Sequence, residues 1–360
     1  MSPSGSLPTE PVGSIPRPPE LVAAVESAQQ GRMKRRDLDA LYDAAIADTI
    51  RRFEDSGSPV ITDGEQRKHD SFWTYGVNGM PNMGQGGFAL QFNSGHARVM
   101  PVLIEGPFRV RLYADSFLAA AQRLTTRPLK QAVISASALS LLYPAEPLPD
   151  YPREAFLEDV VAEHLREIRL CLAQGAHVVQ VDFTEGRLAA KLDPGGALLA
   201  GFVELNNMAL EQLEPAERLR VGVHSCPGGD CDSTHSGEVD YAALIPSLFE
   251  LEAGNFYLQL ASEADRPRVL ALIARFMKPS QRVFVGVTDP LNPVVETAEL
   301  VRDRVLEAAR FIRPENLGTT DDCGFSPFCD DRSTTRDVAF AKIAARVRGT
   351  ALASRILGRG

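Results

Sequence analysis

Short apolar runs typical of β-strands alternate with longer amphipathic segments along almost the whole chain. We predict eight strands, at residues 59–63, 98–104, 131–135, 177–182, 219–225, 255–260, 282–288 and 317–321. Apolar residues recur at helical spacing in segments 38–54, 154–174, 197–211, 241–250, 264–277, 296–311 and 334–356. Alternating strands and helices are typical of a parallel sheet, and eight strands close a (β/α)8 barrel. We therefore predict an α/β fold, a TIM barrel. An open doubly wound sheet is the alternative, but no G-x-G-x-x-G motif supports a dinucleotide fold.

The length of 360 residues suits one such barrel with long loops. We expect a single domain over residues 1–360, with an N-terminal extension at 1–35 and a C-terminal helix at about 334–356. Two long polar segments, 72–97 and 227–238, interrupt the alternation. In a barrel, both would lie at the C-terminal face, where active sites are built.

Composition excludes several classes of protein. The net charge of -9 leaves no basic surface for nucleic acid, and no run of 18 apolar residues could cross a membrane. No secretory signal is readable at the N-terminus. Five cysteines are an odd number and too few for a disulfide scaffold. We expect a cytoplasmic protein with reduced thiols and small-molecule substrates, and the sequence leaves a homo-oligomer open.

The sharpest local motif is His224-Ser225-Cys226, at the end of an apolar strand. Side chains alternate along a strand, so His224 and Cys226 lie on one face and are candidate zinc ligands, although both could simply pack in the core. Cys323 follows the last strand and would face the same barrel mouth. Three soft ligands leave one position open, as in catalytic zinc sites, and favour a thiol substrate that zinc would hold as a thiolate.

The other three cysteines are weaker candidates. Cys231 and Cys329 compete as ligands, but we favour loop positions without a role, and Cys171 falls on the apolar face of a predicted helix.

Polar residues near the other strand ends are candidates for substrate binding. Each could instead be a helix cap or a solvated loop residue, and only their shared placement at one rim argues for function. These candidates are Ser14, Arg17, Glu65, Arg67, Lys68, Asp182 and Asp289. His235, His69 and Tyr75 are candidate proton donors, and the sequence does not choose among them.

Taken in order, these motifs resemble the catalytic C-terminal barrel of the cobalamin-independent methionine synthase family. The matching pieces are Gly13-Ser14-Ile15-Pro16, Asp63-Gly64-Glu65, Val179-Gln180-Val181-Asp182, His224-x-Cys226 and Asp322-Cys323-Gly324. The resemblance implies that His224, Cys226 and Cys323 bind zinc and that zinc binds the acceptor thiol. It also implies that Ser14, Glu65 and Asp182 contact the polar end of the thiol substrate.

Three features depart from that family. The classical enzymes have two barrels, of which the first helps to hold polyglutamyl folate, and this chain matches the second. Their zinc-ligating glutamate has Gln259 at the matching position, with Glu263 four residues on. Leu291 takes the place of a histidine that moves a proton to the folate leaving group, and an apolar side chain cannot do this.

These departures favour the single-barrel branch that resembles epoxyalkane:coenzyme M transferases. Our main hypothesis is a zinc-dependent thiol alkyltransferase whose thiolate opens an epoxide. The alternative is a short methionine synthase that transfers methyl from a folate or a methylcorrinoid to homocysteine, which the acids Glu65 and Asp182 favour. A third hypothesis is a zinc- or thiol-binding barrel without turnover, and a tetrapyrrole decarboxylase of the same superfamily ranks last.

Overall fold

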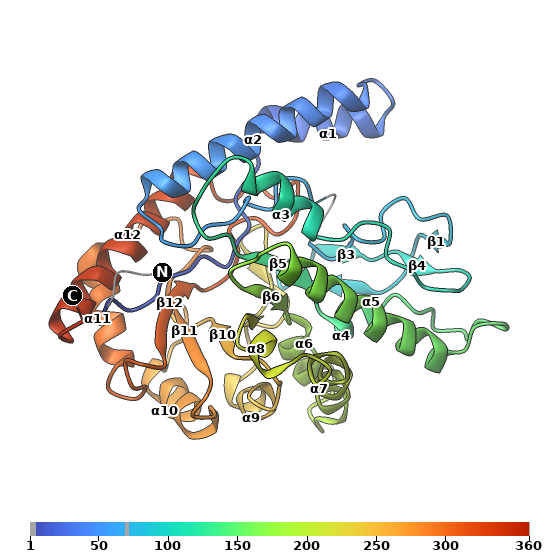
Figure 1. Ribbon diagram of the computed structural model, residues 1–360. Coiled ribbons are helices and arrows are strands. Elements are labelled where there is room, and N and C mark those ends of the chain that lie inside the picture. The colour runs from blue at the N-terminus through green and yellow to red at the C-terminus, as the bar shows by residue number, and fades with distance from the viewer. Residues whose placement is uncertain (1–4, 69–71, 360) are drawn as a thin grey trace.

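The computed structural model describes residues 5–68 and 72–359, and a six-stranded parallel sheet lies at its centre. The strand order is β12-β11-β10-β7-β6-β5 (Figure 1). The bounds of these strands are β5 Gln131–Ile134, β6 Val179–Asp182, β7 Val221–Ser225, β10 Asn255–Leu258, β11 Arg282–Thr288 and β12 Leu317–Asp321. All lie close to strands predicted from the sequence, and the weakly apolar β12 is confirmed with all five residues buried.

Two short segments extend this sheet and close it into a barrel. Thr9 pairs in parallel with Thr319 of β12, and Ile61 pairs in parallel with Leu129, just before β5. The two segments then contact each other. The Thr62 hydroxyl donates to the Gly13 carbonyl at 2.8 Å, and the Ile15 amide donates to the Gly64 carbonyl at 3.0 Å. The barrel thus has eight strand positions, which confirms the predicted TIM barrel.

One of the eight predicted strands was wrong. Residues 98–104 do not enter the barrel, because they form parts of two antiparallel hairpins in the long segment after the second barrel position. The bounds of these short strands are β1 Met83–Gly84, β2 Ala89–Gln91, β3 Ala97–Val99 and β4 Val102–Leu103. The first barrel position is instead the segment around Thr9, which we had assigned to an extension at 1–35. Pro8 and Pro11 break up its apolar pattern and concealed it.

The predicted helices are confirmed to within a few residues at most ends, apart from 241–250, which divides into two short pieces. Their bounds are α2 Arg35–Asp55, α5 Arg153–Ala173, α7 Ala197–Leu210, η1 Tyr241–Ala243, α9 Ile245–Leu248, α10 Arg266–Phe276, α11 Ala298–Ala308 and α12 Arg336–Ile356. Helices that we did not predict are α1 Pro19–Gln29, α3 Asp115–Gln122, α4 Ala136–Ser140, α6 Glu185–Leu192 and α8 Pro215–Arg218. No helix in the described ranges is long and apolar enough to cross a membrane.

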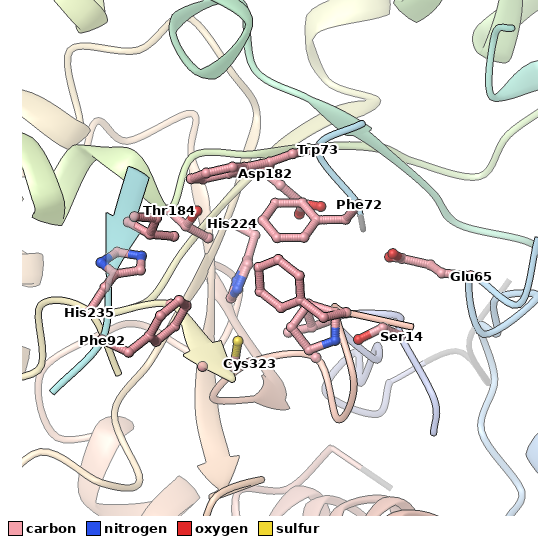
Figure 2. Close-up of a pocket in the computed structure, with 17 residues that line it drawn as sticks. Ser14, Glu65, Phe72, Trp73, Phe92, Asp182, Thr184, His224, His235 and Cys323 are labelled. Carbon is pink, nitrogen blue, oxygen red and sulfur yellow. The ribbon is translucent and has the colours of Figure 1, made fainter. Parts of the chain in front are cut away.

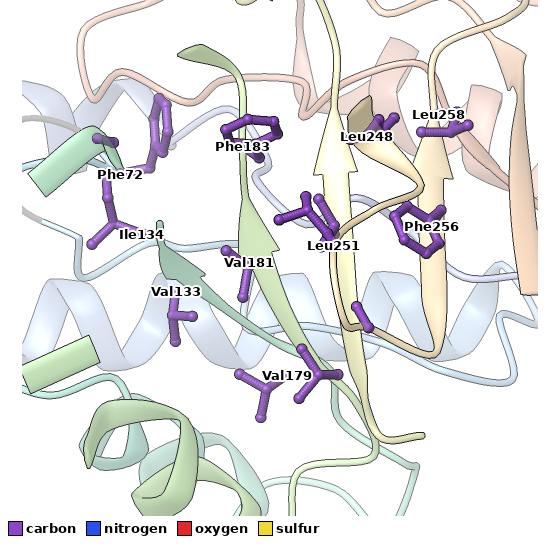
Figure 3. Close-up of a cluster of buried hydrophobic side chains, with 14 of the residues drawn as sticks. Phe72, Val133, Ile134, Val179, Val181, Phe183, Leu248, Leu251, Phe256 and Leu258 are labelled. Carbon is purple, nitrogen blue, oxygen red and sulfur yellow. The ribbon is translucent and has the colours of Figure 1, made fainter. Parts of the chain in front are cut away.

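The main hydrophobic core lies between the strands and the helices around them. Val133 of β5, Val179 and Val181 of β6 and Phe256 of β10 are among its buried residues (Figure 3). The interior of the barrel is partly polar, because the Tyr257 hydroxyl donates to Glu10 Oε2 at 2.6 Å. The outer core fixes the strands, so the residues at their carboxyl ends are held in place.

Candidate metal centre and substrate pocket

Three potential metal ligands meet at the mouth of the barrel. His224 is near the end of β7, Cys226 follows that strand, and Cys323 follows β12. One ligand atom of each lies within 4.8 Å of the other two. In Figure 2, His224 and Cys323 point toward the same central space from different strands. Parallel strands of one barrel bring together residues that are about 100 positions apart, as the sequence predicted.

The ring of His224 is oriented by the neighbouring strand. Its Nδ1 lies 3.1 Å from the Tyr257 carbonyl of β10, which accepts from that nitrogen if it carries the hydrogen. Nε2 is buried and has no hydrogen-bond partner among the described residues. A second-shell contact of this kind is typical of metal-binding histidines, since it fixes the ring and leaves the other nitrogen for the ion.

The two cysteine sulfurs are 3.1 Å apart. The hydrogen bond from Cys226 holds the pKa of Cys323 well below its usual value, and burial raises the pKa of Cys226. One buried imidazole nitrogen without a partner and two adjacent sulfurs form a soft donor set that fits zinc. His224, Cys226 and Cys323 therefore fit the ion that the sequence predicted.

Asp322 fixes the loop that carries Cys323. Its Oδ1 accepts from the amides of Leu260 and Ala261 at 2.9 and 2.8 Å, and its Oδ2 accepts from the amide and hydroxyl of Ser262 at 2.8 and 2.7 Å. Burial still raises the pKa of Asp322 to about 7. The aspartate of the D-C-G motif thus ties the loop after β12 to the loop after β10, which sequence reasoning had not foreseen.

A small pocket of about 30 Å³ lies beside the three ligands (Figure 2). It is lined by Val12, Ser14, Glu65, Phe72, Trp73, Leu90, Phe92, Asp182, Thr184, His224, Gly228, Gly229, His235, Cys323, Gly324, Pro327 and Phe328. The predicted contacts Ser14, Glu65 and Asp182 are thus brought together with two of the ligands. The volume is close to that of one or two waters, so a larger substrate needs the walls to move apart.

Glu65 is held in the pocket wall by a strained turn. Its φ is 58°, in the left-handed region, and Gly64 before it has φ 70°. The buried Lys68 ammonium lies 3.2 Å from Glu65 Oε2. Arg17 donates to the carbonyls of Glu65 and Lys68 at 2.9 and 2.7 Å. Arg17 and Lys68, predicted to bind substrate, do not line the pocket and instead hold the turn that presents Glu65.

Asp182 is the second acid in the pocket. Gln180 Nε2 donates to its Oδ1 at 2.8 Å. Burial, together with the nearby charge of Glu65, raises the pKa of Asp182 to about 6. The Lys68 ammonium lies against Glu65 and balances part of this negative charge, and the charge that remains on the two buried carboxylates attracts a further cation such as a substrate ammonium group.

Ser14 packs directly against the loop that carries the last cysteine. Its hydroxyl accepts from the Ser326 amide at 3.2 Å, and its carbonyl accepts from the Phe325 amide at 3.0 Å. A Cβ at Gly324 would lie 2.1 Å from Ser14 Oγ. The glycine of the D-C-G motif is therefore required for this close approach.

The three predicted proton donors have different outcomes. His235 lines the pocket, and neither ring nitrogen has a hydrogen-bond partner in the described part of the chain. Burial, helped by the nearby Lys191, lowers its pKa to about 3, so the ring is neutral. Tyr75 does not line this pocket and donates to Glu167 Oε1 at 2.9 Å. His69 lies outside the described residues.

Two further predicted contacts lie elsewhere. Arg67 turns away from the pocket and contacts Asp39 and Asp43 at 3.1 and 2.5 Å. Asp289 accepts from the Leu291 amide at 3.0 Å and is not among the residues that line the pocket. Their positions in the sequence placed them near the rim, but their side chains serve local contacts.

Sequence reasoning missed most of the aromatic wall of the pocket. Phe72 and Phe92 come from the long segment 72–97 and Phe328 comes from the loop after β12, and the ring centroids of Phe72 and Phe92 lie 6.0 and 6.2 Å from that of Phe328. From the sequence, Trp73 and Tyr75 of the long segment 72–97 are candidates either for a pocket wall or for the core under the loop, and of these two Trp73 lines the pocket. Single aromatic residues in loops carry no periodic pattern, so only the barrel geometry identifies this wall.

The remaining cysteines do not join the three ligands. Cys171 is buried in α5, and Cys231 is exposed at the turn between β8 (Gly229–Asp230) and β9 (Ser233–Thr234). A second group, His96, Asp230 and Cys231, is close enough to suggest a metal. However, Arg98 donates to both oxygens of Asp230 at 2.6 and 3.0 Å, which satisfies that carboxylate with a cation already.

Comparison with known proteins gives a family match over most of the chain. The model of the family described as cobalamin-independent synthase, catalytic domain, matches residues 7–346. The methionine synthase of Sulfurisphaera tokodaii is 24% identical over 96% of this chain and 91% of its own length, and that of Pyrococcus furiosus is 25% identical over 95% and 91%. A 5-methyltetrahydropteroyltriglutamate–homocysteine methyltransferase of Acidithiobacillus ferrooxidans is 23% identical over 89% of this chain but 39% of its own length.

Solved structures show the same fold. A B12-independent methionine synthase from Shewanella sp. W3-18-1, in complex with selenomethionine, superposes with a TM-score of 0.77 at 18% identity, covering 98% of this chain and 99% of the other. A putative vitamin-B12-independent methionine synthase from Listeria monocytogenes gives 0.70 at 20% identity, covering 97% and 98%. At 18% and 20% sequence identity, these superpositions show a shared fold alone.

Proposed function

We propose that this chain, which belongs to the family of cobalamin-independent synthase catalytic domains, transfers a methyl group to the sulfur of homocysteine or a closely related amino-acid thiol. Family membership over residues 7–346 makes the protein a transferase of the methionine synthase-like kind. The acceptor, the donor and the role of each residue are proposals, and so is zinc.

The observation that carries this proposal is one pocket that is lined by two carboxylates and by two of the three soft ligands, His224 and Cys323. Glu65 and Asp182 suit the ammonium group of an amino acid, whereas the sulfonate of coenzyme M would be repelled by them. The two acids therefore disfavour the epoxide hypothesis, which rests on the departures at Gln259 and Leu291, and the relatives named above are methionine synthases. The alternative from the sequence becomes the main proposal.

Each group of residues around the pocket has its own role in this reaction. His224, Cys226 and Cys323 would hold zinc, which when bound lowers the pKa of a thiol so that its sulfur is nucleophilic at neutral pH. Glu65 and Asp182 bind the ammonium group, and Ser14 shapes the wall beside them. The aromatic wall keeps water from the sulfur. The S–CH3 bond forms as the bond between the methyl carbon and the donor breaks.

The methyl donor is less well defined than the thiol acceptor. A folate leaves as an amine that needs a proton, and Leu291 cannot supply one. Of the three candidate proton donors, His235 lines the pocket, and because burial lowers its pKa to about 3 and leaves the ring neutral, it must first take up a proton when the methyl donor binds before it can deliver one. A methylcorrinoid donor would leave without a proton, so the two donors predict different effects of a His235→Gln substitution.

Mass spectrometry of the products tests this function. The zinc-loaded protein is mixed with homocysteine and either methyltetrahydrofolate or methylcobalamin, and in parallel with coenzyme M and an epoxide. Methionine from either donor supports the proposal. A hydroxyalkyl thioether from the last mixture, without methionine from the others, would overturn it. With the active donor, a tenfold or greater loss in His235→Gln assigns the proton to His235.

A further inference from the structure

The loop after β10 contains two side chains, Gln259 and Glu263, whose oxygen atoms are potential further metal ligands. Gln259 directly follows β10, and its amide donates to the Ser225 carbonyl at 3.3 Å, level with Cys226 on the neighbouring strand. Glu263 follows four residues later. Whether either side chain coordinates the ion decides how many positions remain for substrate.

Both side chains are bound by one buried arginine, Arg187 of α6. Its Nη1 donates to Gln259 Oε1 at 2.8 Å and contacts Glu263 Oε1 at 3.0 Å. The amide nitrogen of Gln259 in turn donates to the Ser262 hydroxyl at 2.6 Å. Oxygen and nitrogen of the glutamine are therefore both engaged, and the glutamate faces a guanidinium.

Arg187 is itself fixed from several sides. Its side chain is 2% exposed, and it donates to the Val239 carbonyl at 2.7 Å and the Gly237 carbonyl at 3.3 Å. Its guanidinium lies 4.8 Å from the ring centroid of Tyr241, whose hydroxyl donates to the Ser225 carbonyl at 3.2 Å. If Glu263 moved to the metal, a buried cation would lose its charge partner, which is costly.

The charges of the ligands also argue against a metal-bound Glu263. A neutral histidine and two thiolates balance the two positive charges of zinc, whereas a bound Glu263 would already supply the additional negative charge that the substrate thiolate brings to the fourth position. No fourth His, Cys, Asp or Glu of residues 5–68 and 72–359 joins the group of three ligands. Asp322, the nearest acid in sequence, accepts four hydrogen bonds from the loop after β10.

We propose that Arg187 is a positioning residue that keeps Gln259 and Glu263 out of the coordination shell. The metal then has three protein ligands, and the substrate thiol enters as the fourth without displacing a side chain. This inference rests on the proposed zinc thiol chemistry. It gives Arg187 a role in the coordination geometry of the metal, in addition to its contacts within the fold.

Cobalt-substituted protein tests the coordination directly, because the visible spectrum of Co²⁺ reports the number and type of its ligands. Glu263→Gln and Gln259→Ala should keep the wild-type spectrum and a zinc Kd within about twofold of wild type. Cys226→Ser is the matched positive control and should change both. A tenfold weaker zinc Kd with an altered spectrum in Glu263→Gln or Gln259→Ala would overturn the inference, and so would the same result in His235→Gln.

Substitution of Arg187 tests the opposite change, in which Glu263 is released toward the metal. Arg187→Met should free Glu263, shift the cobalt spectrum toward a carboxylate-bound centre and weaken homocysteine binding about tenfold. Arg187→Met combined with Glu263→Gln should restore the wild-type spectrum. A folded Arg187→Met protein with an unchanged spectrum would overturn the role of Arg187, and if this variant does not fold, Glu263→Gln decides alone. A wild-type protein that binds no zinc would instead contradict the proposed function.

Discussion

At the scale of single residues, Cys226 and Cys323 differ from the other cysteines because their sulfurs lie beside each other and beside His224. We predict that Cys226→Ser and Cys323→Ser each lose most of the bound zinc, because a serine hydroxyl stays protonated at neutral pH and is a hard ligand. Elemental analysis after dialysis measures this. Cys231→Ser, at an exposed turn, is the control and should keep its zinc. Full metal content in both ligand variants would refute the site.

Asp182 tests how the amino group of the substrate is recognised. Asp182→Asn should raise KM for homocysteine about tenfold or more, since a buried charge-assisted hydrogen bond contributes about 1.5–3 kcal/mol. The KM for a thiol of similar length without an amino group should stay the same. Asp289→Asn is the matched control, because Asp289 does not line the pocket. An equal effect on both thiols would contradict a contact with the ammonium group.

The candidate site was predictable where the chemistry lies at strand ends. The barrel geometry brings these residues to one rim, because they lie at or just after the carboxyl ends of strands whose patterns are readable: His224, Cys226, Cys323, Glu65 and Asp182. Side-chain direction was not predictable. Whether an arginine faces the pocket, a carbonyl or a neighbouring aspartate depends on packing between distant segments, and no local pattern encodes it.

At the scale of elements, periodicity predicted most of the barrel strands and the longer helices, but it missed five helices of at most eleven residues. Buried strands such as β7 and β11 are continuous apolar runs, which makes them easy to recognise. Residues 98–104 carry a similar pattern because parts of the hairpins are also buried. The segment around Thr9 lacks the pattern, because only Thr9 forms a ladder contact and two prolines flank it. The count of eight was therefore right although one member was wrong.

Helix α5 contains an element-scale source of pH dependence. His164 is fully buried, and burial lowers its pKa to about 4. Between pH 6.5 and 4, the unfolded chain binds a proton at this residue that the folded protein does not bind, so stability falls as pH falls. We predict that His164→Leu gains about 2 kcal/mol relative to wild type when the pH is lowered from 7.5 to 5.

Urea unfolding of both proteins at the two pH values measures this difference. Buried carboxyls with raised pKa act in the opposite direction, so only the difference between variant and wild type isolates His164. Leu172→Ala, on the same helix, is the control and should lower stability equally at both pH values. A His164→Leu difference that does not change with pH would contradict the prediction.

At the scale of the whole molecule, the first barrel segment joins parts that are far apart in the chain. Thr9 and Glu10 contact β12 and β10, and four residues further Ser14 contacts the loop of Cys323. The same short segment thus closes the barrel through Thr9 and Glu10 and shapes the pocket through Ser14. Stability of the barrel and geometry of the site are therefore coupled through one short segment.

Glu10→Gln tests this closure. Burial lowers the pKa of Lys130 to about 8 even though Glu10 lies 3.8 Å from its ammonium group, and removing that charge lowers the pKa further. At pH 6.5, wild type keeps the Lys130 proton, and a folded variant that releases it loses up to about 2 kcal/mol of stability, which is the cost of this substitution. At pH 9, Lys130 is largely neutral in both folded proteins, so this cost should fall below about 1 kcal/mol. Chemical unfolding at the two pH values, with Glu26→Gln as an exposed control, measures the change. An equal cost at pH 6.5 and 9 would show that Glu10 acts through its hydrogen bond to Tyr257 and not through the charge of Lys130.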